Sequence, residues 1–358
     1  MPRRPLHAFL AWALLAGAAE PASACTSFLC QRDGTLLFGK SYDWHTPDGL
    51  VLINKRGVDK QALVLQPGVT PARWTSRHAS VTFNQYGREF PAGGMNEAGL
   101  VVEVMWLEST ATPEADPKPA VNELQWIQYL LDTAGTLAEA ITQAEKVWVL
   151  RAYGKAHYLA CDRTGACAAF EYLGGKLTVL QGKDLGVPVL TNHTHAESAA
   201  FLKKHRGFGG EDPIPQGEGS LARYARAASL LPTTEPFEIL RRVAIKDYTK
   251  WNIVYDLIDR TVTFRTSQEP REKKVDLMAF DLSCQSPVQA LDIQHPGPSG
   301  SPSDVTRAFT PYTKERNRDL LRRSLKPIAD KLPPGAVEIL TLYPEGLRCG
   351  ASQTDPGR

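Results

Sequence analysis

The sequence predicts an α+β fold for this chain of 358 residues. Three observations lead to it: β-prone segments open the body of the chain, two segments with helical periodicity follow, and β-prone segments then return. Strands and helices therefore come in blocks, unlike the strict alternation of βαβ units. We expect a layered body built on antiparallel sheets.

Residues 1–24 have the pattern of a secretory signal peptide. Arg3 and Arg4 give a positive start, residues 9–18 are apolar, and residues 22–24 read Ala-Ser-Ala, a small-residue cleavage site. The apolar run is too short to span a bilayer, and no later segment is long enough. We expect a periplasmic or secreted protein without a stable membrane span, with a mature chain that begins at Cys25.

The first predicted block is β-structure. Arg32-Asp33-Gly34 is a hairpin signal between two apolar, β-prone segments. A further turn at 96–99 leads into the last strand of the block. The expected strands are 26–31, 35–40, 50–54, 81–84 and 100–106.

Two helices are expected next. In 121–133, Leu124, Ile127, Leu130 and Leu131 fall on one helical face, and Thr136 opens a second helix to residue 146 with a capping box. Beyond this pair, strands are expected at 156–160, 168–172, 177–180, 187–191, 253–258, 261–266 and 275–281. Helices are expected at 196–205, 221–231 (capped by Ser220) and 238–245.

The last part of the chain changes in composition. Residues 285–305 are rich in Pro, Ser and Gly, which is typical of a linker, and a basic helical segment is expected at 314–331. We therefore predict a domain at 25–284, followed by a linker and C-terminal helical tail at 285–358.

Charge and cysteine content narrow the class of protein. The whole chain has 41 Lys and Arg residues against 39 Asp and Glu residues. It therefore lacks the basic surplus that would indicate a nucleic-acid partner. An exported chain can form disulfides. Cys161 and Cys167 flank a predicted hairpin turn, and Cys284 and Cys349 could fasten the tail, although the sequence alone leaves the connectivity open.

Cys25 is the leading candidate nucleophile. A cysteine at a free N-terminus carries a thiol and an α-amine on one residue, and both groups have ordinary pKa values near neutrality. The amine can take the thiol proton as sulfur attacks a carbonyl carbon and can then return it to a leaving amine. Two alternatives stay open: a lipid-anchor cysteine and an ordinary buried strand residue.

Four segments then resemble the signatures of the choloylglycine hydrolase family, the linear-amide hydrolases that include bile salt hydrolases and penicillin V acylases. They are Cys25 with the segment 38–44, the run 94–100, the triplet 190–192, and the run 220–226. Each signature alone is weak evidence for the family. Four signatures in this order, starting at a cysteine that signal-peptide cleavage would expose, are specific for it. The resemblance covers roughly residues 25–282 and implies a four-layer αββα sandwich of the N-terminal nucleophile hydrolases.

The resemblance also implies site roles. Cys25 is the nucleophile, and its amine is the base. Asp43 holds the α-amine, Asn192 donates to the oxyanion, and Arg223 supports the surroundings of the nucleophile. Lys40 stands where the family usually has arginine, so it keeps a cation but loses the planar fork.

Trp44 and Trp106 resemble the Gram-negative branch of the family and imply an apolar acyl pocket. Members of that branch cleave penicillin V and some long-chain N-acyl-homoserine lactones. His193 and His195 form a His-x-His pair, but no cluster with ligand spacing completes a metal site.

The sequence thus predicts an exported hydrolase that cleaves a small linear amide with an apolar acyl group through a Cys25 thioester. It implies no cofactor, no metal and no nucleic-acid partner, and it leaves a homo-oligomer open. One alternative is a bile salt or N-acyl amino acid amidase. The other, from a different class, is a lipid-anchored binding module with an acylated Cys25.

Overall fold

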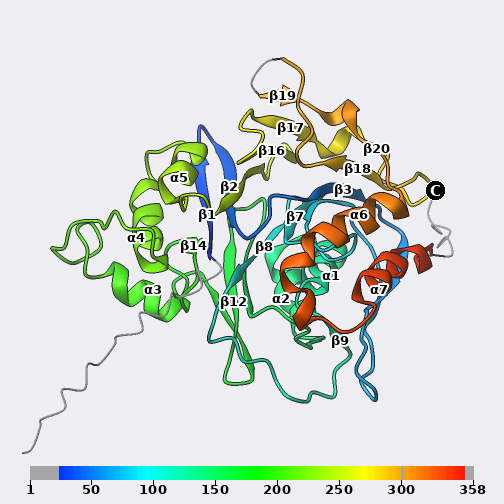
Figure 1. The fold of residues 1–358 in the computed structure, drawn as a ribbon. Helices are drawn as coiled ribbons and strands as arrows, with labels where there is room; N and C mark the ends of the chain where they lie inside the picture. Colours follow the sequence, from blue (N-terminus) through cyan, green and yellow to red (C-terminus); the bar gives the residue numbers. More distant parts are fainter. Residues whose placement is uncertain (1–23, 300–301, 351–358) are drawn as a thin grey trace, which may run out of the picture.

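The computed structural model describes residues 24–299 and 302–350, so the predicted signal peptide lies outside the described residues except for Ala24. Two large sheets stack face to face, and helices cover both outer faces (Figure 1). This is the expected four-layer αββα arrangement. Among the described residues, no helix is long and apolar enough to cross a membrane.

The first sheet carries the N-terminus. Within the described residues its strand order is β14-β1-β2-β15-β16-β17-β19. Its strands are β1 (Ala24–Arg32), β2 (Thr35–Asp43), β14 (Val189–Leu190), β15 (Thr249–Asp256), β16 (Thr261–Thr266), β17 (Lys273–Asp276) and β19 (Ser303–Asp304).

The second sheet has the order β13-β12-β11-β8-β7-β6-β3-β18-β20 within the same ranges. Its strands are β3 (Leu50–Asn54), β6 (Ser80–Asn84), β7 (Gly93–Asn96), β8 (Val101–Trp106), β11 (Ala156–Cys161), β12 (Cys167–Leu173), β13 (Lys176–Gln181), β18 (Gln289–Asp292) and β20 (Thr310–Pro311). Small sheets join β4 (Val58–Gln61), β5 (Arg73–Thr75) and β21 (Arg348–Cys349), and join β9 (Ala120–Val121) to β10 (Trp148–Val149).

The hairpin between β1 and β2 sets the direction of the mature N-terminus. Asp33 and Gly34 both have positive φ, of 49° and 82°, as a two-residue type I′ turn requires. Side chains alternate between the faces of β1. Cys25 and Leu29 belong to the core between the two sheets, whereas Phe28 and Cys30 face the helical layer.

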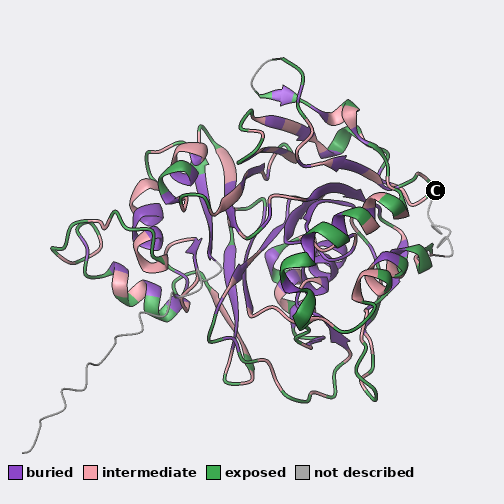
Figure 2. Cartoon of the chain, in the orientation of Figure 1, coloured by how far each residue is buried: buried purple, intermediate pink, exposed green. Residues whose placement is uncertain are grey.

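Helices shield the outer face of each sheet. α1 (Gln125–Thr133) and α2 (Leu137–Ala144) pack on the second sheet, where the Trp126 and Tyr158 ring centroids lie 4.2 Å apart. α3 (His195–Leu202), α4 (Ser220–Leu230) and α5 (Pro236–Val243) accompany the first sheet. α6 (Lys314–Ser324) and α7 (Ala336–Leu342) lie near the C-terminal end of the described chain, and much of their surface is exposed (Figure 2).

Two elements have boundaries that differ from the predicted ones, because in each case a polar side chain accepts backbone N–H groups at the end of the element. The helix expected from residue 121 begins at Gln125, since Asn122 Oδ1 accepts the N–H groups of Leu124 and Gln125. The strand expected at 275–281 ends at Asp276, whose carboxylate accepts the Met278 N–H and starts a 3₁₀ turn.

The stretch expected to be a linker, residues 285–305, contributes to both sheets. β18 pairs with β3 along four residues, and β19 pairs with β17. The Pro- and Gly-rich composition therefore reflects two short strands, β18 and β19, and the turns around them. The helix expected at 314–331 ends at Ser324, and a 3₁₀ segment with a proline in its first turn continues from Lys326.

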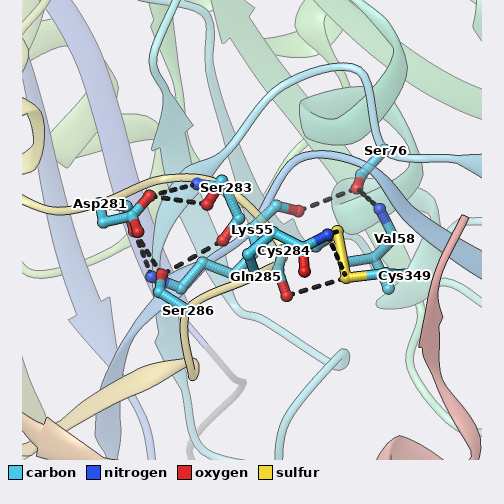
Figure 3. The surroundings of a disulfide bond; sticks show 9 residues. All are labelled: Lys55, Val58, Ser76, Asp281, Ser283, Cys284, Gln285, Ser286 and Cys349. Carbon is cyan, nitrogen blue, oxygen red and sulfur yellow. Dashed lines mark hydrogen bonds between the residues drawn. A yellow bond between two sulfur atoms is a disulfide. The ribbon is translucent and has the colours of Figure 1, made fainter. Parts of the chain in front are cut away.

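Both cysteine pairs singled out in the sequence are bonded. Cys161 and Cys167 are directly opposite in the β11–β12 pair and form one disulfide. Cys284 and Cys349 form the other, which Figure 3 shows beside the segment 55–58. Cys25 and Cys30 are free and buried.

Candidate active site

Cys25 lies near the start of β1, where the first sheet faces the second. It is 5 % exposed, it pairs with Tyr42 across the hairpin, and Ala24 pairs with Asp43. Burial raises the pKa of the Cys25 thiol, while the charges of Lys40 and Arg223 oppose that rise. Burial therefore favours the neutral thiol over the thiolate.

Asn192 holds the backbone nitrogen of Cys25. It directly follows β14, and its Oδ1 accepts the Cys25 N–H at 2.9 Å. Its Nδ2 donates to the Trp106 carbonyl at 2.9 Å, which fixes the orientation of the amide. Ser220, expected as a helix cap, instead accepts the Asn192 N–H at 2.8 Å, because α4 starts one residue earlier than expected, with Gly219 as its N-cap.

Arg223 binds the same group of atoms from α4. Its Nη1 donates to the Cys25 carbonyl at 2.7 Å and to Thr26 Oγ1 at 2.6 Å, and its Nη2 donates to Asn192 Oδ1 at 2.7 Å. Its Nε donates to the Glu218 carbonyl. The side chain is only 1 % exposed. A planar fork can make all these bonds at once, which a lysine amine cannot.

Asp43 completes this group at the end of β2. Its Oδ1 accepts hydrogen bonds from Ser41 (2.8 Å) and Thr249 (2.5 Å). Its Oδ2 is buried, lies 3.9 Å from Arg223 Nη1, and has no hydrogen-bond donor among the described residues. Burial raises the pKa of the Asp43 carboxyl, and Arg223 opposes that rise. Asp43 Oδ2 is therefore an acceptor that no described donor uses.

Lys40 occupies a separate polar cluster between the sheets. Its Nζ donates to the Val104 carbonyl, contacts Met105 Sδ at 3.4 Å and lies 3.6 Å from Glu103 Oε2. The same Met105 sulfur accepts from Ser27 Oγ at 3.1 Å. Lys40 thus supports the strands behind the thiol and does not join the Asn192–Arg223 contacts.

Glu103 is a residue that the sequence reasoning missed. Its Oε1 accepts from Tyr255 Oη at 2.5 Å, and burial raises its pKa to about 7. A Cβ at position 93 would lie 2.1 Å from its carboxyl carbon, so glycine at 93 makes room for it. A lone carboxylate within the apolar strand Val101–Trp106 was the signal that could have found it.

Trp44 and Trp106 line a cavity in front of Cys25. Their ring centroids lie 6.0 Å apart at an interplanar angle of 41°. The cavity has a volume of about 390 Å³, and most of the side chains that line it are apolar. Trp106 Nε1 donates to Glu108 Oε2 at 2.9 Å, so its polar edge is satisfied outside the apolar space. The pocket suits an apolar acyl group next to the thiol.

His195 of the His-x-His pair has other partners, whereas His193 Nδ1 is buried without a hydrogen bond among the described residues. His195 donates its backbone N–H to Glu171 and places Nε2 2.7 Å from the Leu185 carbonyl. Among the described residues, no group of three or more His, Cys, Asp or Glu side chains could hold a metal ion. The candidate site is therefore made of Cys25 with Asp43, Asn192 and Arg223, and Trp44 and Trp106 line its pocket.

A sequence model described as linear amide C-N hydrolases, choloylglycine hydrolase family, matches residues 25–234. The chain belongs to this family. The match starts at Cys25 and contains Asp43, Asn192 and Arg223, which the fold brings together.

Individual relatives agree with this assignment. The chain is 28% identical over 190 residues to the penicillin V acylase of Pectobacterium atrosepticum, a match that covers 48% of this chain and 50% of the relative. It therefore spans about half the length of that relative.

Two solved structures share the fold. The penicillin V acylase of Agrobacterium tumefaciens has a TM-score of 0.69 at 24% identity and covers 81% of this chain and 98% of its own. A variant of the conjugated bile acid hydrolase of Clostridium perfringens has a TM-score of 0.62 at 16% identity, with 75% and 97% covered.

Proposed function

We propose that this family member is an exported acylase, which uses mature Cys25 to cleave linear amides with an apolar acyl group. One observation carries the proposal. A buried thiol lies at the wall of an apolar pocket, and its own backbone nitrogen and carbonyl are held by Asn192 and Arg223. The buried backbone groups of a strand residue are usually bonded by neighbouring backbone, whereas here two polar side chains from distant segments bond them.

Removal of residues 1–24 would supply the base. In the chain as described, the Cys25 nitrogen is a peptide N–H, and Ala24 is opposite Asp43. Cleavage converts that nitrogen into an amine and removes Ala24. Asp43 Oδ2, which has no donor among the described residues, could then accept a hydrogen bond from the new amine.

The proposed reaction has two halves. The α-amine takes the thiol proton, and sulfur bonds to the amide carbonyl carbon while the carbonyl oxygen becomes an oxyanion. The C–N bond then breaks, the leaving amine takes the proton from the α-ammonium, and a thioester remains on Cys25. Water next attacks the thioester with the α-amine as base, which releases the carboxylic acid and restores the thiol.

Asn192 is the proposed oxyanion donor. An amide NH₂ has two hydrogens, and the contact with the Trp106 carbonyl uses one of them. The other can donate to the oxyanion. Loss of such a donor from an enzyme site costs about 10²–10³ in rate.

The test combines N-terminal processing with hydrolysis. We expect the exported protein to start with an unmodified Cys25 by intact mass and N-terminal sequencing, and to hydrolyse penicillin V, acyl-homoserine lactones or other acyl amides in a panel that includes conjugated bile salts. Cys25→Ser should lower turnover at least 100-fold, because a hydroxyl is far less acidic than a thiol. A diacylglyceryl modification on Cys25, or near-normal turnover by the serine variant, would refute the proposal.

A further inference from the structure

We propose that the C-terminal segment 325–340 forms the distal wall of the acyl pocket and sets the length of acyl chain that the enzyme accepts. This inference rests on the proposed acylase function. It concerns a part of the chain more than 90 residues beyond the end of the family match at residue 234.

The segment contributes a set of apolar side chains to the cavity in front of Cys25. They come from the C-terminal end of α6, from the 3₁₀ segment and the residue after it, and from α7. These side chains are Leu325, Ile328, Leu332, Ala336, Ile339 and Leu340. Trp44 and Trp106 line the same cavity. One continuous apolar space thus runs from the thiol to the C-terminal segment.

The size of the cavity favours an extended acyl group. An apolar protein cavity of about 150 Å³ is enough to hold benzene. This cavity, at about 390 Å³, is more than twice as large. A single aromatic ring would therefore leave part of it unfilled, and a long aliphatic chain could reach the C-terminal wall.

The wall is held firmly against the body of the protein. Tyr343 donates to the Gln61 carbonyl at 2.7 Å and accepts from Gln125 Nε2 at 2.8 Å. Asn317 Oδ1 accepts the Arg88 N–H at 2.9 Å. Leu321, Leu325 and Ile328 form a buried cluster against Tyr86 and Tyr153. These contacts indicate a fixed wall, able to exclude chains that are too long.

A disulfide fastens the far end of this wall. Cys284 and Cys349 are 65 residues apart in sequence, and the loop that they close contains α6 and α7. Next to the bond, β21 pairs with β4, and the Gly350 N–H donates to the Gly57 carbonyl at 2.8 Å. In Figure 3, Ser76 Oγ accepts the Val58 N–H at 2.9 Å and donates to the Lys55 carbonyl at 2.8 Å. These bonds hold the segment 55–58 beside the disulfide.

The first test narrows the pocket at its distal end. Ala336 lines the cavity, whereas Ala329, in the adjacent 3₁₀ segment, is exposed and lies outside it. We compare N-butanoyl- and N-decanoyl-homoserine lactone, which share one leaving amine. Ala336→Phe should lower kcat/KM for the decanoyl substrate at least tenfold and change the butanoyl value less than twofold. Ala329→Phe should change neither.

A second pair of variants keeps the proposal testable if Ala336→Phe does not fold. Leu340→Ala enlarges the pocket, and Leu342→Ala, with Leu342 48 % exposed, is the matched control. Only the first should raise KM for the decanoyl substrate, by about fivefold or more. Equal changes for both substrates, or equal changes in variant and control, would overturn the proposal.

Binding separates this inference from the proposed function. Failure of the wild-type protein to hydrolyse any acyl amide would defeat the acylase function alone. Calorimetric titration of the same variants with decanoic acid then decides the role of the wall. Tenfold weaker binding to Ala336→Phe than to Ala329→Phe supports it, and equal binding refutes it.

Discussion

Arg223→Lys separates a positioning role from a merely structural one. The substitution keeps the positive charge near Asp43 but replaces a three-nitrogen fork with a single amine. Arg223 reaches four acceptors through Nε, Nη1 and Nη2. A lysine amine can occupy one of these three positions, so some of the acceptors lose their donor.

The expected cost can be worked from those bonds. A buried acceptor left unsatisfied costs about 1–3 kcal/mol. Asn192 Oδ1 retains the Cys25 N–H, so the acceptors most affected are those at Thr26 and Glu218. We therefore expect the free energy of unfolding to fall by about 2–4 kcal/mol. We expect kcat/KM to fall about 100-fold or more, because the Cys25 carbonyl and Asn192 Oδ1 lose the guanidinium that fixes them relative to each other.

Arg226→Lys is the matched control. Arg226 lies on the same helix, is 6 % exposed, and also donates to backbone carbonyls, those of Pro215, Gly217 and Arg242. It does not touch Cys25. Urea denaturation should show similar losses of stability for the two variants, while acyl-amide hydrolysis should fall steeply only for Arg223→Lys. Similar kcat/KM values for the two would refute the positioning role.

Three further predictions concern other parts of the chain. Glu103→Gln should reduce a pH dependence: burial raises the Glu103 pKa to about 7, so between pH 4.5 and 7 the wild type should lose about 3 kcal/mol more stability than the variant, as read from denaturation at each pH, and equal losses would contradict this. Lys60→Met should cost about 3–5 kcal/mol in urea denaturation, because Glu89 and Asp132 lose a buried ammonium at 2.6 and 2.9 Å, and a loss below about 1 kcal/mol would contradict this. Trp106→Ala should raise KM for aromatic or long acyl substrates several-fold, and an unchanged KM would remove Trp106 from the pocket.

The site also explains why the lysine at position 40 is tolerated where relatives are expected to carry arginine. Glu103 and the Val104 carbonyl lie within reach of a single ammonium group, so no fork is needed there. The fork is needed at Arg223, where acceptors from β1, the Asn192 segment and the start of α4 converge.

Local sequence determined much of this protein. The Asp33-Gly34 turn and the helix around Ile127 each depend on a few neighbouring residues, and these predictions were confirmed within the described chain. The order of the four signature segments predicted the family, which the family match confirmed. The catalytic roles of Cys25 and its neighbours remain predictions.

Tertiary structure decided what depends on distant partners. Glu103 meets Lys40 only when the two sheets stack, and Ser220 turns to Asn192 only when α4 packs beside β14. β18 becomes a strand because β3 offers its edge, which composition cannot reveal. The pocket wall at 325–340 likewise lies about 300 residues from Cys25 along the chain, and no local pattern encodes a contact at such a separation. The local conformational preferences of the residues determine where helices and strands form. Burial of apolar side chains and pairing of strands distant in sequence determine which residues come into contact.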